Sequence, residues 1–573
     1  MAAPGAHVWL GRPPEPLLRA PPFPGAKAAI LSKWSPHPVD HHGGEGGIEA
    51  CVAALKTARV GGTFWGAQPD FEITNPIIAR PAFLAQARVM LAHAVGAGVI
   101  SRVILWLPSR SEGALLAGES SVPMIFGVCD PWHLLAKAGA VWLDAEDENA
   151  LLAQIADVSH VSFAEDGPVA QGDKIDGQHS AVEASLLDRT AYVDPFTGDA
   201  SDVMSTIALL GYWRGLIDSN RSIVGAAGFA YWKKAAVEPL LWGGVEPVQF
   251  LSANITALDS TPRSGALALW KSRVPPEFLR HAETQGRDVF EVEDGFIRSA
   301  GLGADCVPPL SIVVDKVGVH FDPAGPSELE NLLQHGEFSP AILERAERLR
   351  RLIIETGVSK YGVGGGVLDR PGGARRHILV TGQVEDDRSV LSGGGDVAGN
   401  LDLLRRARAQ EPDAHILYKP HPDVEAGHRK GHVPEDQALA FADSIVRDAP
   451  ISSLLEMVDA VHVLTSLAGF EALIRGKQVI THGVPFYAGW GLTTDLNVVP
   501  VRRTARRDVI EMVAAVLLLY PRYLDPVTAL PCPPEVLVKR LVAGIRKENW
   551  AIVSLRRLQG SARQKLSKMG ITI

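Results

Sequence analysis

AHILYKPHPD, residues 414–423, is the stretch that decides the fold of this chain. Its first five residues are mostly apolar and β-forming, so they predict a buried strand. Two prolines then end the strand, because proline cannot donate a hydrogen bond to a sheet ladder. They hold Lys419 and His421 at its carboxyl end, which is where open α/β sheets bind ligands. A cation and an imidazole at this place predict a phosphate site, and a plain surface turn is the alternative interpretation.

Two more predicted strands, 377–380 and 460–464, also end in polar residues. These residues are Gln383 and Asp387 after the first strand, and Thr465 and Ser466 after the second. Thr465 and Ser466 stand at the start of a predicted helix, whose free N–H groups favour an anion. Because the carboxyl ends of parallel strands meet at one edge of a sheet, we expect the three strand ends to line one crevice.

A last strand is predicted at residues 478–482, followed by a segment rich in aromatic residues and glycine. Tyr487 and Trp490 in this segment suit a contact with a base or a sugar.

A second cluster of charged residues follows a predicted strand at residues 286–292. The cluster contains Glu293, Asp294 and Arg298, next to glycines that would let a ligand approach the backbone. It is a plausible site. A turn with an internal ion pair between Glu293 and Arg298 is the alternative interpretation.

The composition is that of a globular protein. The chain has 573 residues, of which 46% are hydrophobic and 21% charged, and its length predicts roughly two to four domains. The net charge of −9 gives no support to nucleic-acid binding. Four scattered cysteines argue against disulfides and structural zinc. No signal-peptide pattern and no membrane-spanning apolar run is found, so a cytoplasmic location is expected.

The pattern divides the chain into five regions. They are a small, divergent or degenerate α/β region (1–190), a helical connector (191–247), an acceptor-side Rossmann-like half (248–370), a donor-side Rossmann-like half (371–500) and a helical basic tail (501–573). Asp130-Pro131-Trp132-His133 in the first region predicts a helix start. The acceptor-side half contains a predicted β-hairpin, 309–322, and a predicted helix, 326–356.

The end of the tail is strongly basic. From Lys539 onward it carries nine Lys or Arg residues against one acid, Glu548. Interleaved apolar residues make it a candidate helix on the inner-membrane surface. A solvated basic helix that closes the domain is the alternative.

Two strand-helix halves that each place polar groups at strand ends predict the fold class. It is α/β, with a GT-B-like pair of Rossmann-type domains preceded by the smaller N-terminal region. In the GT-B arrangement of nucleotide-sugar glycosyltransferases two such halves face each other across a cleft.

Several motifs then identify a family. They are EDGFIRSAGLG (293–303), PPLSIVVDKVGVHFDP (308–323), GQVEDDRSV (382–390), YKPHPDVEAGHRKG (418–431), TSLAGFEALIRGK (465–477) and PFYAGWGLTTD (485–495). Over residues 190–530 the chain resembles capsular polysaccharide synthesis proteins of the KpsC type, and it matches their C-terminal module.

The resemblance implies a retaining β-Kdo transferase. Such an enzyme uses CMP-β-Kdo to extend a lipid-linked Kdo primer, and its partners include other capsule synthesis and export proteins. Family members commonly carry two modules, but residues 1–185 lack the QVEDD and TSxxGFE motifs. We therefore expect one active module.

With this activity expected, roles for single residues follow as a hypothesis. His421 would donate to the CMP phosphate, Lys419 would add charge, and Glu471 would accept from the ribose hydroxyls. Gln383, Thr465 and Ser466 complete the expected donor site. Retention of configuration requires either two displacements or front-face departure, and two displacements need a carboxylate near the anomeric carbon.

Asp387 is the expected nucleophile, and Glu293 or Asp294 the expected general base. A cap on the following segment is the alternative interpretation for Asp386 and Asp387. No cofactor is expected, and a divalent metal is not required, because His421 and Lys419 can stabilise the single phosphate of CMP. Two other hypotheses for the whole chain are a GT-B transferase with another nucleotide sugar and a non-catalytic capsule assembly subunit.

Overall fold

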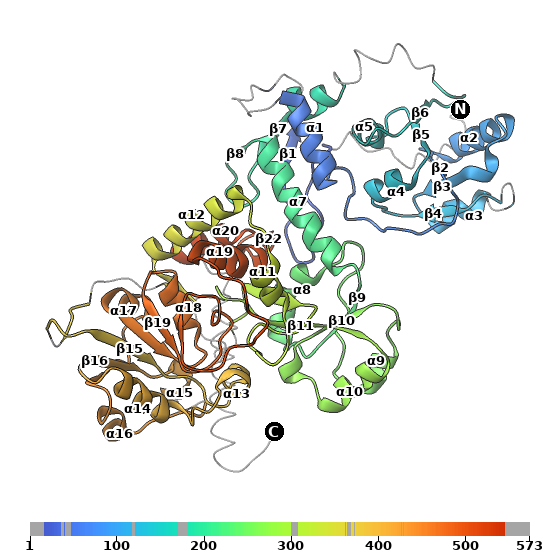
Figure 1. Cartoon of the computed structure of the whole chain (residues 1–573). Helices are drawn as coiled ribbons and strands as arrows, with labels where there is room; N and C mark the ends of the chain where they lie inside the picture. Colours follow the sequence, from blue (N-terminus) through green and yellow to red (C-terminus); the bar gives the residue numbers. More distant parts are fainter. Residues whose placement is uncertain are drawn as a thin grey trace. The chain divides into compact units, whose positions relative to one another are not determined.

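The computed structural model describes residues 16–35, 39, 47–116, 118, 121–169, 181–298, 307–360, 362–363, 368–371, 373–425, 427 and 429–544. The chain divides into two compact units (Figure 1). The first comprises Met1–Ser222 and Leu241–Val248, and the second comprises Ile223–Leu240 and Gln249–Ile573.

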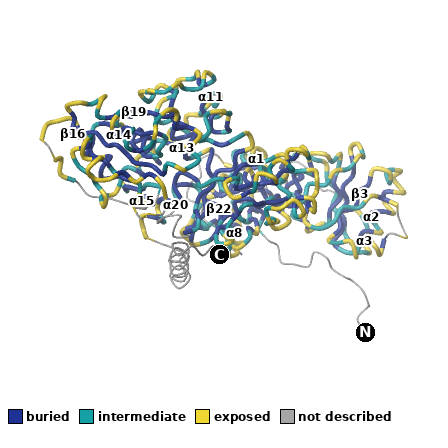
Figure 2. Tube along the Cα trace, turned by 90° about the horizontal axis from the view of Figure 1, so that it is seen from below, coloured by how far each residue is buried: buried dark blue, intermediate teal, exposed yellow. Residues whose placement is uncertain are grey.

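The first unit is built on a parallel sheet with the strand order β4-β3-β2-β5-β6. Its strands are β2 (Ile77–Arg80), β3 (Val103–Leu107), β4 (Met124–Phe126), β5 (Ala140–Asp144) and β6 (His160–Phe163). Strand β3 is buried along its whole length, as its dark tube in Figure 2 shows. Apolar runs of this kind are typical of parallel strands covered on both faces. The predicted small α/β region is confirmed.

Helices α2 (Leu84–Gly96), α3 (Arg110–Leu116), α4 (Pro131–Lys137) and α5 (Asn149–Ile155) alternate with these strands. Asp130 is the N-cap of α4 and accepts from the Trp132 N–H, so the predicted helix start is confirmed. The rest of the unit consists of β1 (Ser32–Trp34), β7 (Thr190–Val193), β8 (Ala200–Ser201), α1 (Gly47–Ala58) and α7 (Val203–Asn220).

The donor-side half of the second unit has a parallel sheet with the order β17-β16-β15-β18-β19-β20. Its strands are β15 (His377–Thr381), β16 (His415–Lys419), β17 (Ser444–Ile445), β18 (Ala460–Val463), β19 (Gln478–Thr481) and β20 (Thr494–Asp495). In chain order this is 3-2-1-4-5-6, the order of dinucleotide-binding folds, and it places a ligand crevice between β15 and β18.

The core of this half explains the strand pattern. Ile378, Val380 and Ile416 are fully buried against Leu403 and Leu404 of a covering helix. The helices of this half are α13 (Arg388–Gly393), α14 (Asn400–Gln410), α15 (Pro422–Glu425), α16 (Glu435–Leu439), α17 (Ile451–Met457) and α18 (Leu467–Leu473). Each predicted strand of this half lies within one residue of the observed one.

The acceptor-side half has a mixed sheet with the order β22-β21-β12-β11-β10-β9. The strands are β9 (Ile223–Ala227), β10 (Ala266–Leu269), β11 (Asp288–Asp294), β12 (Ser311–Asp315), β21 (Pro521–Leu524) and β22 (Pro531–Cys532). Strands β9 to β11 are parallel, and β12, β21 and β22 are antiparallel to their neighbours. The predicted fold class, two Rossmann-like halves after a smaller α/β region, is confirmed.

The predicted hairpin 309–322 is wrong in its second strand. Residues 319–322 form no strand, and β12 pairs instead with β11 and β21. The physical reason is the Asp315 carboxylate, which accepts from the N–H groups of Val317, Gly318 and Glu328. It folds the chain into a turn that leads directly into α11 (Glu328–His335).

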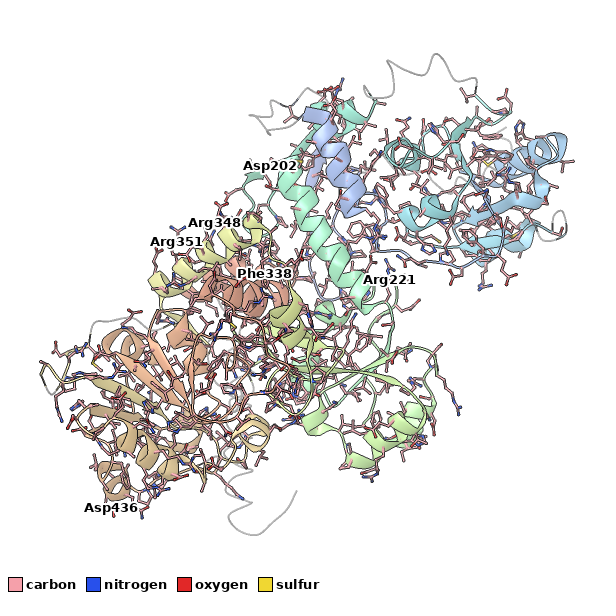
Figure 3. All side chains as sticks on the ribbon, viewed as in Figure 1. Asp202, Arg221, Phe338, Arg348, Arg351 and Asp436 are labelled. Carbon is pink, nitrogen blue, oxygen red and sulfur yellow. The ribbon has the colours of Figure 1, made fainter. Side chains whose placement is uncertain are left out.

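The predicted helix 326–356 is two helices, α11 and α12 (Pro340–Thr356). Ser339 caps the second helix by accepting from the Ile342 N–H. Arg348 and Arg351 on α12 are exposed (Figure 3), with 53% and 60% of their side-chain surface open to solvent. They lie on a solvated face.

Two predicted region boundaries need correction. The connector 191–247 is divided, because β9 and most of α8 (Tyr231–Leu241) belong to the acceptor-side half. The tail 501–573 is not only a tail, because β21 and β22 extend the acceptor-side sheet.

Helices α19 (Val509–Val513) and α20 (Pro534–Val542) flank these strands. Helices α9 (Ile255–Asp259) and α10 (Pro276–Thr284) complete the half. The predicted membrane-surface helix falls mostly on residues 545–573, which lie outside the described residues.

Candidate functional site

Two residues that the sequence predicted to converge, Gln383 and Thr465, meet at the carboxyl ends of β15 and β18. Gln383 donates from Nε2 to Thr465 Oγ1 over 2.9 Å, and its Oε1 accepts from the Thr465 N–H over 2.8 Å. The Gln383 N–H is bound to Asn400 Oδ1. The predicted convergence of the two strand ends is therefore observed. The Gln383 amide, however, holds the strand ends together, and its contact with a donor stays a prediction.

His421 follows β16 in a defined orientation. Its Nδ1 accepts from the Asp423 N–H over 3.2 Å, so the neutral ring carries its proton on Nε2. Burial lowers the pKa of His421, although the nearby Asp423 carboxylate acts in the opposite direction. Near neutral pH the residue is thus an uncharged ring whose Nε2–H can donate to an anion.

Lys419 lies at the end of the same strand but faces another neighbour. Its ammonium donates to the carbonyl oxygen of Arg447, just beyond β17, over 3.0 Å. Burial lowers its pKa. Its predicted contact with a phosphate stays a prediction.

The start of α18 uses its polar groups internally. Ser466 is the N-cap and accepts from the Ala468 N–H over 3.3 Å. Glu471, one turn further, is buried and accepts from the Lys360 N–H over 3.0 Å. Burial raises the Glu471 pKa. One Glu471 oxygen therefore secures the chain after α12, and its predicted ribose contact stays a prediction.

The predicted sugar contacts of Tyr487 and Trp490 need correction. Both side chains have an exposed fraction of 0%. The Tyr487 hydroxyl donates to the Ser466 carbonyl, and Trp490 Nε1 donates to the Phe486 carbonyl over 2.8 Å. With their polar atoms satisfied inside the protein, these rings serve packing instead of ligand binding.

Two carboxylates stand at the end of β11 and point to opposite faces, as successive strand residues do. Asp294 binds Lys233 Nζ at 3.3 Å and Arg298 Nε at 2.8 Å. Glu293 binds Arg388 Nη1 at 2.8 Å. The alternative ion pair between Glu293 and Arg298 is not formed, because Arg298 is used by Asp294.

The environments of these carboxylates push their pKa values apart. Burial raises the pKa of Glu293 to about 7, against the opposing charge of Arg388. Burial would also raise the pKa of Asp294, but the charges of Arg298 and Lys233 outweigh it and hold this pKa below its usual value. Adjacent carboxyl groups with separated pKa values can divide acid-base and nucleophilic roles.

Arg388 links the two halves of the second unit. It begins α13 on the donor side and binds Glu291 and Glu293 of β11, each at 2.8 Å. Lys271 binds the other Glu291 oxygen at 2.7 Å. The carboxylates of β11 therefore lie where the halves meet.

Sequence reasoning missed two residues of this cluster, Arg388 and Lys233. Arg388 directly follows the QVEDD motif, which was a signal that could have been used. Lys233 lies in the segment that the sequence assigned to a connector, so no local signal pointed to it.

Asp387, the expected nucleophile, is the N-cap of α13. Its Oδ2 accepts from the Ser389 hydroxyl over 2.6 Å and from the Ser389 N–H over 3.2 Å. The capping alternative is therefore the arrangement that the structure shows. The neighbouring Asp386 is exposed and pairs with Arg429 at 3.2 Å. Asp387 as a nucleophile stays a prediction.

Comparison with known proteins agrees with the sequence motifs. Residues 265–363 and 368–523 match the family described as capsule polysaccharide biosynthesis protein. The predicted resemblance to capsule polysaccharide biosynthesis proteins is confirmed. A capsule polysaccharide modification protein, LipA of Neisseria meningitidis serogroup A, is 38% identical over 359 residues, or 63% of this chain and 51% of the relative. The lipopolysaccharide-processing protein LpsZ of Rhizobium meliloti is 46% identical over 239 residues, or 41% of this chain and 54% of the relative.

The chain thus spans about half the length of the curated relatives it matches. Among solved structures it is similar to a Thermosulfurimonas dismutans protein titled KpsC, beta Kdo 2,4 transferase. The two share 30% identity with a TM-score of 0.48, over 56% of this chain and 98% of the other. Within the described part of the chain, no helix is both long and apolar enough to cross a membrane.

Proposed function

We propose that the second unit is a retaining glycosyltransferase module that transfers Kdo from CMP-β-Kdo to a lipid-linked Kdo primer in capsule biosynthesis. One observation carries the proposal: Glu293 of β11, with a pKa raised to about 7, is bound at 2.8 Å by Arg388, the residue next to Asp387, where the two Rossmann-like halves meet. The family match over residues 265–363 and 368–523 supports the capsule context.

The donor side would bind the nucleotide. In the proposed complex, the CMP phosphate accepts from His421 Nε2–H at the end of β16. The neutral tautomer set by the Asp423 N–H supports this role, because it leaves Nε2 as a donor without requiring a charged ring.

Two displacements would then retain the configuration. In the first, an Asp387 oxygen attacks the anomeric carbon while the bond to the phosphate oxygen breaks, and CMP leaves with the electron pair. In the second, Glu293 takes the proton of the acceptor hydroxyl, which attacks the same carbon and releases Asp387 as a carboxylate. A Glu293 pKa of about 7 suits a base that works near neutral pH.

The nucleophile is assigned to Asp387 because its charge acts on His421, the proposed phosphate ligand, and because the next residue, Arg388, binds Glu293 at 2.8 Å. Both bonds to Ser389 use Asp387 Oδ2. Because CMP departs with a single phosphate, the proposed reaction needs no divalent metal.

The test is sugar transfer from CMP-Kdo to a synthetic Kdo-primed lipid. We expect CMP release with the intact chain, and in the absence of acceptor we expect a covalent sugar adduct that peptide mass spectrometry assigns to Asp387. An adduct on another carboxylate, or an Asp387→Ala variant that keeps full activity, would overturn this assignment.

Other outcomes would overturn the proposed function. Transfer from a UDP- or GDP-sugar but not from CMP-Kdo would refute the donor assignment. Retained membrane binding without any transfer would favour a non-catalytic assembly subunit.

A further inference from the structure

Arg287, the residue before β11, is a buried arginine without a carboxylate partner in the described part of the chain. Its exposed fraction is 6%. Its Nη2 donates to the Thr261 hydroxyl over 2.9 Å. Its Nε and Nη1 are shielded from solvent and have no hydrogen-bond partner among the described residues. An unpaired buried charge is costly to keep, and a buried polar group without a partner calls for an explanation such as a bound ion.

The charge that acts on Arg287 is that of a second arginine, Arg263. Burial lowers the Arg287 pKa, and the positive charge of Arg263 adds to this effect. Arg263 shortly precedes β10, and Arg287 immediately precedes β11. These strands are parallel neighbours, with Ala266 paired to Asp288. The amino ends of β10 and β11 therefore carry two like charges, one buried and one exposed.

The acidic side chains closest in sequence to this arginine pair do not neutralise it. Asp259, ahead of Arg263, is engaged by the end of α10, because it accepts from Gln285 Nε2 over 2.6 Å. Asp288, which follows Arg287, is exposed. Neither carboxylate is among the groups that shift the Arg287 pKa. The buried guanidinium is therefore suited to an anion from outside the chain.

A phosphate group matches the arginine pair in charge and in geometry. It carries a charge of about −1.5 to −2 near neutral pH, which two guanidinium groups balance. A guanidinium is planar and offers its N–H groups in a fixed fork that phosphate oxygens accept. Because Thr261 holds Nη2, the protein already restricts the orientation of the Arg287 guanidinium.

We propose that Arg287 and Arg263 form a binding site for a phosphate group at the amino ends of β10 and β11. The carboxylates Glu293 and Asp294 lie at the other end of β11, which spans 7 residues or about 20 Å. The site is thus separate from the proposed reaction centre and from the donor site, which belongs to the other half. It does not rest on the proposed function. A lipid headgroup and a soluble phosphate compound are the two sources that this chemistry allows.

The test is hydrogen exchange of the peptides 257–264 and 284–289, with inorganic phosphate as the probe and chloride at equal ionic strength as the reference. We expect phosphate to slow exchange in both peptides of the parent. Arg263→Gln changes an exposed side chain, and it should raise the phosphate concentration needed for this protection about 10-fold or more, the worth of one charge-assisted contact. Arg273→Gln is the matched control, since Arg273 is also exposed but follows the carboxyl end of β10, and it should behave as the parent.

A second variant separates phosphate binding from a purely structural role of the buried side chain. Arg287→Met keeps an apolar stem but removes the charge. Without phosphate it should unfold at the thermal midpoint of the parent or above it, because an uncompensated buried charge is costly. Phosphate should then raise the midpoint of the parent more than that of Arg287→Met, since a ligand stabilises only the protein that binds it. A loss of stability in Arg287→Met that is equal with and without phosphate overturns the proposal.

Vesicles of phosphatidylglycerol identify the source of the phosphate. Cosedimentation that is about 5-fold weaker for Arg263→Gln than for Arg273→Gln assigns a lipid headgroup. Equal vesicle binding by the two variants, together with protection by inorganic phosphate, assigns a soluble phosphate compound. If phosphate protects neither peptide of the parent, the site is refuted, whether or not the chain transfers sugar.

Discussion

Acid should destabilise the donor-side half through one pair of buried histidines. His462 on β18 and His482 after β19 have exposed fractions of 1% and 3%. Their rings share a hydrogen bond of 3.0 Å between His462 Nδ1 and His482 Nε2. Burial lowers the pKa of His462 to about 3 and that of His482 to about 4. Both rings are therefore neutral in the folded protein across the mildly acidic range.

The direction and size of this change in stability follow from the linkage between proton binding and folding. An unfolded histidine titrates near pH 6.5, so below this pH the unfolded chain binds protons that the folded protein does not bind. The stabilising contribution is complete above about pH 6.5 and is lost as the pH falls toward the folded pKa values. At pH 5 the loss is about 2 kcal/mol for each histidine, or about 4 kcal/mol for the pair. That is a large share of the ~5–15 kcal/mol that stabilises a typical domain.

The measurement is hydrogen exchange of peptides from β18 and β19 in a urea series at pH 7 and pH 5, corrected for intrinsic exchange rates. The control is a double variant, His462→Gln with His482→Gln, in which no ring can be protonated. Carboxylates titrate in both proteins, so the difference between them isolates the pair. We expect the parent to lose about 4 kcal/mol more than the variant between the two pH values. Equal losses in the two proteins would refute the reasoning.

Three further predictions concern single residues. Glu293→Gln should remove the ascending limb near pH 7 from the pH profile of kcat for sugar transfer, because the parent base has a pKa of about 7; a limb that persists in the variant would assign the base elsewhere. Gly469→Ala should destabilise the donor-side half by about 1–3 kcal/mol in urea unfolding, because a Cβ at this position would lie 2.2 Å from the Tyr487 hydroxyl. Gly476→Ala is the comparison variant. Its added carbon has nothing within 4 Å but its φ is +70°, so it shows the cost of backbone strain without a clash. Asp130→Asn should cost the first unit about 3–5 kcal/mol, since it breaks the buried bond of 2.6 Å to Arg214 Nη2; a change in thermal midpoint no larger than that of the exposed pair variant Asp70→Asn would contradict it.

The strands of the donor-side half could be predicted because their signals are local. Residues 414–418 are an apolar run closed by proline, and the run ends within one residue of the observed β16. The Asp130 helix start is equally local, since an N-cap bonds to the backbone two residues away. The crevice at Gln383 and Thr465 followed from the general rule for parallel strands, although the two residues lie far apart in the chain.

The sheet of the acceptor-side half was harder to predict from the sequence, because it is assembled from segments that lie far apart in the chain. Strands β21 and β22 come from beyond residue 520; β21 pairs with β12, about 200 residues earlier, and β22 pairs with β21. Nothing in the sequence around residues 309–322 shows that the partner strand of β12 lies beyond residue 520. The second hairpin strand is absent because Asp315 turns the chain toward α11, and β21 takes the place beside β12 instead.

By itself, the sequence determined the family resemblance, the two Rossmann-like halves and the strand ends at which polar residues gather. Only the tertiary structure decided how individual side chains are used. It made Asp387 a helix cap, buried Tyr487 and Trp490, and surrounded Asp294 with Lys233 and Arg298. The physical reason is the separation along the chain of the groups involved. A strand or a cap depends on neighbours a few residues away, whereas burial and charge depend on groups that the fold brings together from far along the chain.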